Sequence, residues 1–263
     1  MSTVTSKIGI AREHVHLGLF AGFGIAFLAL SLPAVLEPMT FWTGIILGDY
    51  QYPTHEFHHL VLGSVLPVLL LGVLAQAIRP SARVGALHSA IIIWLSVTIV
   101  SAIGGDFSPV HLVLLVLLLG MAVTHPVGRD QLPTFGGVNR PLAVVVTITA
   151  VGGVGLAATE LVAHLTVTDG HVALGHYLFV AATALSIAGL AVYGALNGIG
   201  WRYPVYSSAF LLAVIGLGSI LYPAAEQGSS LGITGGLLVV LWAIALIAVA
   251  EKGDVLTERL AGR

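Results

Sequence analysis

The residues best suited to chemistry stand side by side at the start of a long apolar stretch. His55, His58 and His59 lie within five residues of sequence, Glu56 lies among them, and the apolar run 61–78 follows directly. Ionisable groups at the mouth of a membrane segment are costly and are usually functional. Neutral imidazoles bind heme iron and other transition metals. The sequence therefore predicts a heme or metal site here.

Composition places these residues in a membrane protein. The chain has 263 residues, of which 57% are hydrophobic and 8% are charged, and its mean hydropathy is +1.01. Soluble domains average about 25% charged residues, so we expect a lipid bilayer to surround this chain. Cysteine is absent and the net charge is −2. These counts exclude thiolate sites and disulfides and argue against a nucleic-acid partner.

The apolar runs predict an all-α integral membrane protein with eight transmembrane helices. Runs of about 20 apolar residues are long enough to cross a bilayer, and turn residues and charges separate them. Glu37-Pro38, for example, is expected to end the first helix. The predicted spans are 15–36, 57–78, 84–104, 109–125, 142–164, 173–196, 204–222 and 231–250.

The cations predict the orientation. When eight spans are threaded, all ten lysines and arginines fall on one side. The positive-inside rule then places both termini in the cytoplasm, as expected for a multi-pass protein of the plasma membrane. Seven of the eleven histidines gather at the outer face: His55, His58, His59, His111, His164, His171 and His176.

The same order of histidines, spans and arginines occurs in the first and second halves of the chain. An outer histidine, a span, an inner arginine and another span follow His55, and the same order follows His171, 116 positions later. Such an internal repeat indicates repeated architecture. We therefore predict two pseudo-repeated four-helix bundles, residues 1–128 and 138–263, joined by a cytoplasmic linker at 127–139.

Heme ligation needs one histidine on each of two facing helices at similar depth. His59 on the second predicted span and His111 on the fourth meet this requirement. In the second half His176 corresponds to His59, but no histidine stands at 230–234, where the partner of His111 would fall. The sequence thus predicts a complete ligand pair in one half and a single ligand in the other.

Three short motifs resemble a known family. Glu56-Phe57-His58-His59-Leu60 is similar to the Glu-x-x-His signature of heme A synthases, and His111 resembles the histidine of that family's fourth helix. Leu174-Gly175-His176-Tyr177 resembles the motif that opens the sixth helix. His164 stands where the family often has a polar end to the fifth helix.

This resemblance implies a function and roles for four residues. Heme A synthases hydroxylate a methyl group of heme O to give heme A for terminal oxidases. By this likeness His59 and His111 would ligate the substrate heme, and His176 would hold a heme b cofactor. Glu56 would assist proton movement or stabilise charge near the reacting methyl group. An electron donor or a terminal-oxidase assembly partner would be the expected protein partner.

The chain also departs from the family. Leu60 and Tyr177 replace the arginine that usually follows the histidine, the cysteine-bearing outer loops are missing, and the eighth-helix histidine is absent. These departures point to a diverged relative that binds one heme or uses it differently. A non-catalytic b-type heme protein, either an electron carrier or a heme-handling assembly factor, is therefore an alternative.

Non-heme metals are a further alternative. His55-x-x-His58-His59 and His171-x4-His176 form histidine boxes, a pattern typical of membrane non-heme iron hydroxylases. Further candidate metal ligands of the cluster are His55, His58, His164 and His171. A copper or zinc site is a third hypothesis, with ligands from His164, His171, His176, Asp169 and Glu160.

Two features are expected to be structural. Glu160 precedes His164 by four residues, so the two side chains are predicted to pair on one helix face. Gly152-Gly153-x-Gly155 and Gly235-Gly236 lie inside predicted spans, where small residues permit close helix packing.

Overall fold

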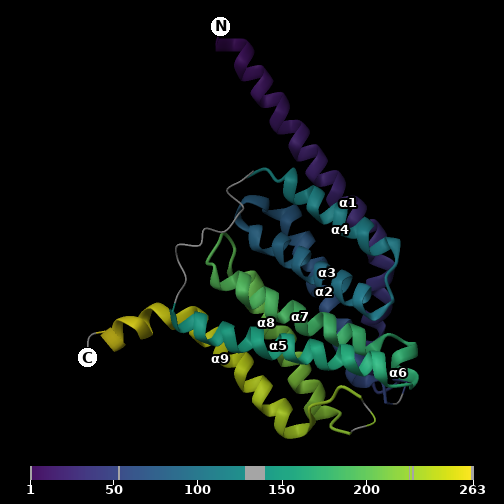
Figure 1. Cartoon of the computed structure of the whole chain (residues 1–263). Helices are drawn as coiled ribbons and strands as arrows, with labels where there is room; N and C mark the ends of the chain where they lie inside the picture. Colours follow the sequence, from purple (N-terminus) through teal and green to yellow (C-terminus); the bar gives the residue numbers. More distant parts are fainter. Residues whose placement is uncertain (1, 53, 128–139, 225, 227, 262–263) are drawn as a thin grey trace.

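The computed structural model describes residues 2–52, 54–127, 140–224, 226 and 228–261. Every regular element in this part of the chain is helical (Figure 1), as expected in lipid, where backbone groups must pair within the protein. The elements are α1 (Ser2–Leu47), α2 (Glu56–Ile78), the 3-10 helix η1 (Pro80–Ala82), α3 (Val84–Gly104), α4 (Pro109–Val123), α5 (Arg140–Thr166), α6 (Gly170–Ala173), α7 (His176–Ala195), α8 (Arg202–Leu221) and α9 (Gly232–Ala261).

The helices are those of a multi-span membrane protein. Seven of them are long and apolar enough to cross a bilayer. α4 is apolar but has 15 residues, a length of about 22 Å as a helix against about 30 Å of hydrocarbon. The helical content predicted from composition is confirmed, whereas a crossing by residues 109–125 stays a prediction. The predicted linker 127–139 lies, apart from Val127, outside the described residues.

The first helix does not end where Glu37-Pro38 predicted. α1 continues through Pro38 to Leu47. A proline removes one backbone hydrogen bond, but packing against α2 holds the helix on both sides of it. A Cβ atom added to Gly63 of α2 would come within 2.9 Å of the Pro38 carbonyl oxygen and 2.8 Å of Trp42 Nε1. This close packing keeps α1 helical at a position where the local sequence Glu37-Pro38 favours a helix end.

Four helices form the centre of the bundle and four surround them. α2, α3, α7 and α8 are the central helices, and they are mostly buried, whereas α1, α4, α5 and α9 lie outside them (Figure 1). The difference is large: 72% of the most apolar stretch of α7 is buried, against 17% of the corresponding stretch of α9. Apolar side chains on the outer helices therefore need lipid as their partner.

The helix contacts repeat between the two parts of the chain. α1 packs on α2 and α4, and α5 packs on α7 and α9 in the same way. α3 contacts α4 as α8 contacts α9, and α2 contacts α3 as α7 contacts α8. The two sets join through the reciprocal contacts of α3 with α7 and α2 with α8.

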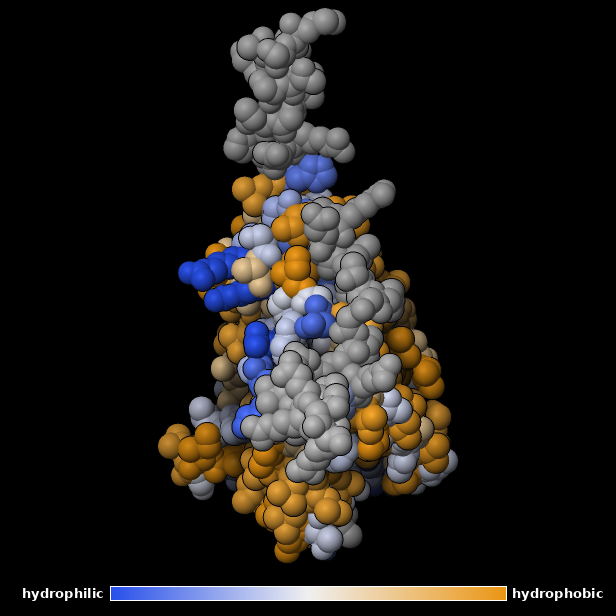
Figure 2. Space-filling view, turned by 90° about the vertical axis from the view of Figure 1, so that its left-hand side faces the viewer, coloured by the Kyte–Doolittle hydropathy of each residue, from blue (hydrophilic) through white to orange (hydrophobic). Residues whose placement is uncertain are grey.

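The surface is largely apolar. Figure 2 views the end of the bundle that carries η1 and the turn between α7 and α8. Hydrophilic residues gather on this end face, while hydrophobic residues cover the flanks. The many large hydrophobic side chains exposed on α1, α5 and α9 belong to these flanks. This distribution suits a bundle whose sides contact hydrocarbon and whose ends contact water.

Glycine permits close helix contact at the positions where backbones meet. A Cβ atom on Gly153 of α5 would lie 2.7 Å from the Ala184 carbonyl oxygen of α7. A Cβ atom on Gly216 of α8 would lie 2.7 Å from the Gly236 carbonyl oxygen of α9. The predicted packing role therefore holds for Gly153 and Gly236, whereas a Cβ atom on Gly152 or Gly155 would meet open space.

This difference predicts the stability of two neighbouring variants. Gly153→Ala should lower the free energy of unfolding by about 1–3 kcal/mol, because a rigid backbone carbonyl must move. Gly152→Ala should be neutral or stabilising by up to about 1 kcal/mol, because alanine favours helix. Thermal unfolding of both proteins in detergent measures the contrast, and equal stability would contradict the α5–α7 contact.

Candidate functional site

Five histidines from three segments meet at one end of the bundle. His55 is the N-cap of α2, and His58 and His59 lie in its first turn. His171 lies in α6 and His176 begins α7. Because α2 and α7 pack against each other, their amino-terminal ends bring the five imidazoles into mutual contact.

Three of these histidines have the geometry of a metal site. One ring nitrogen from each of His55, His171 and His176 can be chosen so that all three lie within 4.8 Å of one another. The Nδ1 atoms of His55 and His176 are 3.1 Å apart. Ligands of one zinc-sized ion at about 2.0–2.1 Å from the metal lie about 3–4 Å from each other. The three rings are therefore close to the spacing that a single ion requires.

A tight turn places His171 beside His176. Gly175 adopts a φ of +68°, a left-handed conformation that glycine adopts without strain. Asp169 caps α6 by accepting hydrogen bonds from the backbone N–H groups of His171 and Val172, at 2.9 and 3.0 Å. The predicted span 173–196 is thus divided, and α7 begins only at His176.

Hydrogen bonds hold Asp169 and His171 in fixed orientations. The Tyr177 hydroxyl donates to Asp169 Oδ2 at 3.0 Å. Burial opposes ionisation of Asp169, but hydrogen bonds from Val172, Tyr177 and His171 hold the pKa of its carboxyl below the usual value. His171 Nε2 donates to the Thr54 carbonyl oxygen at 3.0 Å, and its Nδ1 faces Asp169 Oδ2 at 3.4 Å. A metal ion bound at His171 Nδ1 would lie beside the Asp169 carboxylate.

His55 is held in the form that binds metals. Burial, followed by the charge of His171, lowers the pKa of His55, while the charges of Glu56 and Asp169 act in the opposite direction. The shifted imidazole stays neutral at physiological pH and keeps a nitrogen lone pair for a ligand.

His58 is anchored by a buried chain of hydrogen bonds. Ser229 Oγ donates to Glu160 Oε2 at 2.6 Å, and His58 Nε2 lies 2.9 Å from Ser229 Oγ. Because the Ser229 proton is used on Glu160, His58 must donate from Nε2, and its Nδ1 carries the lone pair. His58 Nδ1 is buried and has no hydrogen-bond partner among the described residues.

A cavity of about 520 Å³ opens beside the cluster. Its volume falls in the range of small-molecule and cofactor pockets. His59 of α2 and His111 of α4 both line it, together with His55 and His176. Its other walls are mainly apolar side chains from α1, α2, α3 and α7. The two histidines predicted as a heme pair therefore face one common space.

Both histidines of this pair are oriented by neighbours. The Tyr50 hydroxyl hydrogen-bonds His59 Nδ1, and the Phe41 ring stacks on the His59 ring with centroids 3.8 Å apart. His111 Nδ1 accepts a hydrogen bond from the Ser108 backbone N–H at 3.1 Å, and the His111 ring stacks against Trp94 with ring centroids 5.8 Å apart. These contacts engage Nδ1 of each ring, so Nε2, in its unprotonated form, is the atom that could bind iron.

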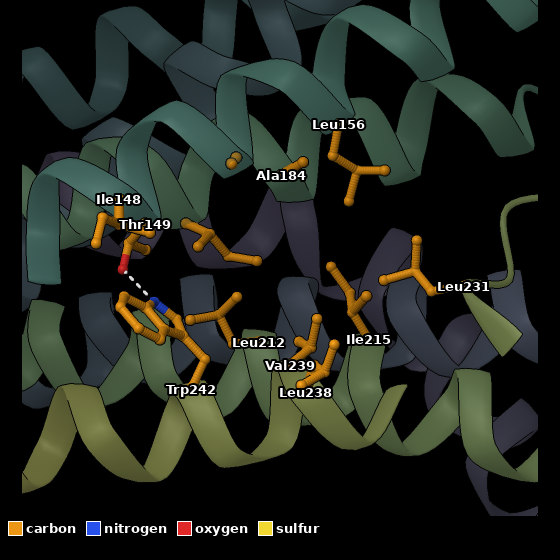
Figure 3. A pocket seen from close by; sticks show the side chains of 13 residues that line it. Ile148, Thr149, Leu156, Ala184, Leu212, Ile215, Leu231, Leu238, Val239 and Trp242 are labelled. Carbon is orange, nitrogen blue, oxygen red and sulfur yellow. Dashed lines mark hydrogen bonds between the residues drawn. The ribbon is translucent and has the colours of Figure 1, made fainter. Parts of the chain in front are cut away.

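The second set of helices encloses a cavity of different chemistry. A space of about 430 Å³ lies between α5, α7, α8 and α9 (Figure 3). Its walls are apolar except where Trp242 Nε1 donates to Thr149 Oγ1 at 2.9 Å. The residues that line this cavity include no histidine and no charged side chain. It offers no ligand to a metal or a heme iron.

The other predicted site residues lie around the cluster or apart from it. The charge of Glu56 is the second cause, after burial, of a raised pKa at Tyr50, which places the two groups near each other. Glu160 accepts from Ser229 in place of the predicted His164 partner. His164 Nδ1 is buried without a hydrogen-bond partner among the described residues, and its ring makes none of the contacts that join the five histidines.

Three residues of the site had no clear signal in the sequence. Tyr50 and Phe41 precede the histidines in an aromatic-rich stretch, which is a weak cue for ring stacking. Ser229 is separated from its two partners by 69 and 171 positions. Sequence spacing carries no information about such long-range contacts.

No protein-family model matches this chain, and neither a curated protein nor a solved structure matches it. The resemblance to heme A synthases therefore stays a prediction from the motifs around His59, His111 and His176.

The buried hydrogen-bond chain from His58 through Ser229 to Glu160 predicts that replacing Ser229 destabilises the protein. Ser229→Ala would deprive Glu160 of a donor and His58 Nε2 of an acceptor, so the free energy of unfolding should fall by about 1–3 kcal/mol. Ser230→Ala is the matched control, because Ser230 Oγ only accepts a longer bond of 3.3 Å from the Gly232 N–H. Equal thermal stability of the two variants in detergent would show that the chain does not form.

Proposed function

We propose that this protein is a heme-binding membrane oxidoreductase that resembles heme A synthases. One observation carries the proposal: His59 of α2 and His111 of α4 line the same cavity of about 520 Å³. These are the two positions that the motifs match to the substrate-heme ligands of that family. Imidazoles from two facing helices are a common way to hold heme iron.

The residues present fit a heme. Tyr50 contacts Nδ1 of His59, and Ser108 contacts Nδ1 of His111, so both rings have an outer partner and could bind iron through Nε2. Phe41 and Trp94 fix the two ring planes by stacking. Leu62 and the other apolar walls offer a surface suited to the apolar faces of a porphyrin ring. A bound heme would supply iron and, in a synthase-like reaction, the methyl group that is oxidised.

The lining of the second cavity supports a proposal of only one heme per chain, bound elsewhere. His176 corresponds to His59 in the sequence repeat, but it lines the first cavity and not the second. The second cavity has no imidazole in its lining. A heme b cofactor held by His176 in the second half therefore has no support from the geometry. The proposal is one heme per chain, in the first half.

The reaction follows from the resemblance. The substrate would be heme O, the product would carry an oxidised methyl group as on the path to heme A, and Glu56 would stabilise charge near that methyl group. An oxygen-atom source, an electron partner and a terminal-oxidase assembly partner would be supplied from outside the chain. Glu56 lies near Tyr50, which bonds the proposed ligand His59, and this neighbourhood supports its role.

We also propose an eight-span protein of the plasma membrane with both termini in the cytoplasm. The repeated helix contacts support two equivalent four-helix halves, with α1, α2, α3 and α4 matching α5, α7, α8 and α9. The amino-terminal end of α1 and the carboxyl-terminal end of α9 both lie away from α6 and its histidines (Figure 1). This arrangement supports a histidine cluster at the outer face.

Heme content tests the proposed ligands. His59→Ala and His111→Ala should each abolish bound heme or reduce it by about half, because each removes one axial ligand. His88→Ala is the control, because His88 bonds Tyr193 and does not line the cavity. Pyridine hemochrome analysis per mole of purified protein gives the readout. Equal heme in all three variants would refute the assignment.

Cysteine labelling tests whether α4 crosses the membrane. The chain has no cysteine, so Asp106→Cys and Pro126→Cys each provide a single thiol at an exposed position, one on each side of α4. In intact cells a membrane-impermeant maleimide should label Asp106→Cys and not Pro126→Cys. Ser81→Cys, an exposed position in η1, should also be protected. Labelling of both sites that flank α4 would reduce the number of spans.

A further inference from the structure

We propose that His55, His171 and His176 bind one divalent transition-metal ion at a centre separate from the heme iron. The proposed heme ligands are His59 and His111, so the two ligand sets share no residue. The metal centre does not depend on whether heme binds.

The three ligands are held in place before any ion binds. They come from α6 and from the amino-terminal ends of α2 and α7, and their ligand atoms lie within 4.8 Å of one another. His171 donates Nε2–H to the Thr54 carbonyl oxygen, so Nδ1 is its ligand atom. A metal-binding histidine commonly donates its other ring N–H to a carbonyl oxygen in this way. Asp169 Oδ2, 3.4 Å from that Nδ1, adds negative charge next to the ion.

The contact between His55 and His176 also favours an ion. Their Nδ1 atoms are 3.1 Å apart, so one must carry a proton while no ion is bound. An ion would replace this proton and use both lone pairs. The rings of His55 and His171 also pack closely, with ring centroids 4.6 Å apart.

His58 supplies an independent observation. Its side chain is buried, with 1% of its surface exposed, and Ser229 and Glu160 fix the tautomer that leaves a lone pair on Nδ1. That nitrogen has no hydrogen-bond partner in the part of the chain that the structure describes, which is unfavourable for a buried acceptor. The His58 ring stacks on His176 at 4.8 Å and lies 4.9 Å from His171. A three-histidine ion keeps a position open for water, and such a water would donate to His58 Nδ1.

The donor set selects the class of metal. Three neutral imidazoles suit Zn²⁺, Cu²⁺, Fe²⁺ or Ni²⁺, whereas Mg²⁺ and Ca²⁺ prefer oxygen ligands. His171 and His176 are buried and His55 is half-buried, so the ion would be shielded from solvent on most sides. The inferred ligand is therefore a nitrogen-preferring transition metal and not an alkaline-earth ion.

Zinc binding to the purified full chain, without a histidine tag, tests this centre. The protein is stripped with a chelator and dialysed against Zn²⁺, and bound zinc and heme are both measured per chain. We expect one tightly bound Zn²⁺ in the wild type. His171→Ala should weaken Zn²⁺ binding at least about 100-fold, because even the loss of a residue that only orients a ligand costs about 10–100-fold. His164→Ala, which alters a half-buried histidine outside the trio, should bind Zn²⁺ as the wild type does.

Two further variants make the result decisive. His171→Asp retains a ligand atom and should restore most of the Zn²⁺ affinity, which separates loss of a ligand from loss of fold. His111→Ala should lose heme and keep Zn²⁺, whereas His171→Ala should keep heme and lose Zn²⁺. Unchanged zinc affinity in His171→Ala, or no zinc bound by folded wild-type protein, would overturn the centre. Loss of heme alone would count only against the proposed heme function.

Discussion

The structure depends on how buried imidazoles find partners in a chain that has few charges to offer. Each neutral histidine carries one donor nitrogen and one acceptor nitrogen, and leaving either unpaired away from water costs free energy. Tyr50, Ser229 and the Thr54 carbonyl oxygen each engage one nitrogen of a different ring. His58 Nδ1 is buried and has no hydrogen-bond partner among the described residues, and three neighbouring imidazoles lie close enough together that they could hold a metal ion.

The rest of the fold brings these rings together and shields them. α2 and α7 are central, and they carry histidines at the same end because the two sets of helices pack reciprocally. Close contacts at Gly153 and Gly216 draw the outer helices onto this centre. The peripheral helices expose apolar surface on their outer faces, and three of them also supply single groups to the site: Phe41 of α1, His111 of α4 and Glu160 of α5. Each set of helices borders one cavity. Histidines line part of the first cavity, whereas the second is lined by apolar residues.

The sequence alone predicted the long helices and the candidate histidines, but it did not predict the hydrogen-bond partners of those histidines. Apolar runs predicted each long helix, because length and hydropathy are local properties. The prediction that the first helix ends at Glu37-Pro38 was wrong. Pro38 and Trp42 pack closely against Gly63 of another helix, and the local sequence around Pro38 does not reveal this contact. The predicted partners His59 and His111 do share a cavity. The links from His58 through Ser229 to Glu160 could not be predicted, because they depend on how three segments fold against one another.

A visible absorption spectrum of the purified protein tests the central claim most directly. The protein would be expressed with heme precursor, purified in detergent, and recorded oxidised and after reduction with dithionite. The account predicts a Soret band and sharp reduced α and β bands, with about one heme per chain, as expected for iron held by two imidazoles. A colourless protein that also shows no Soret shift on titration with hemin would contradict it.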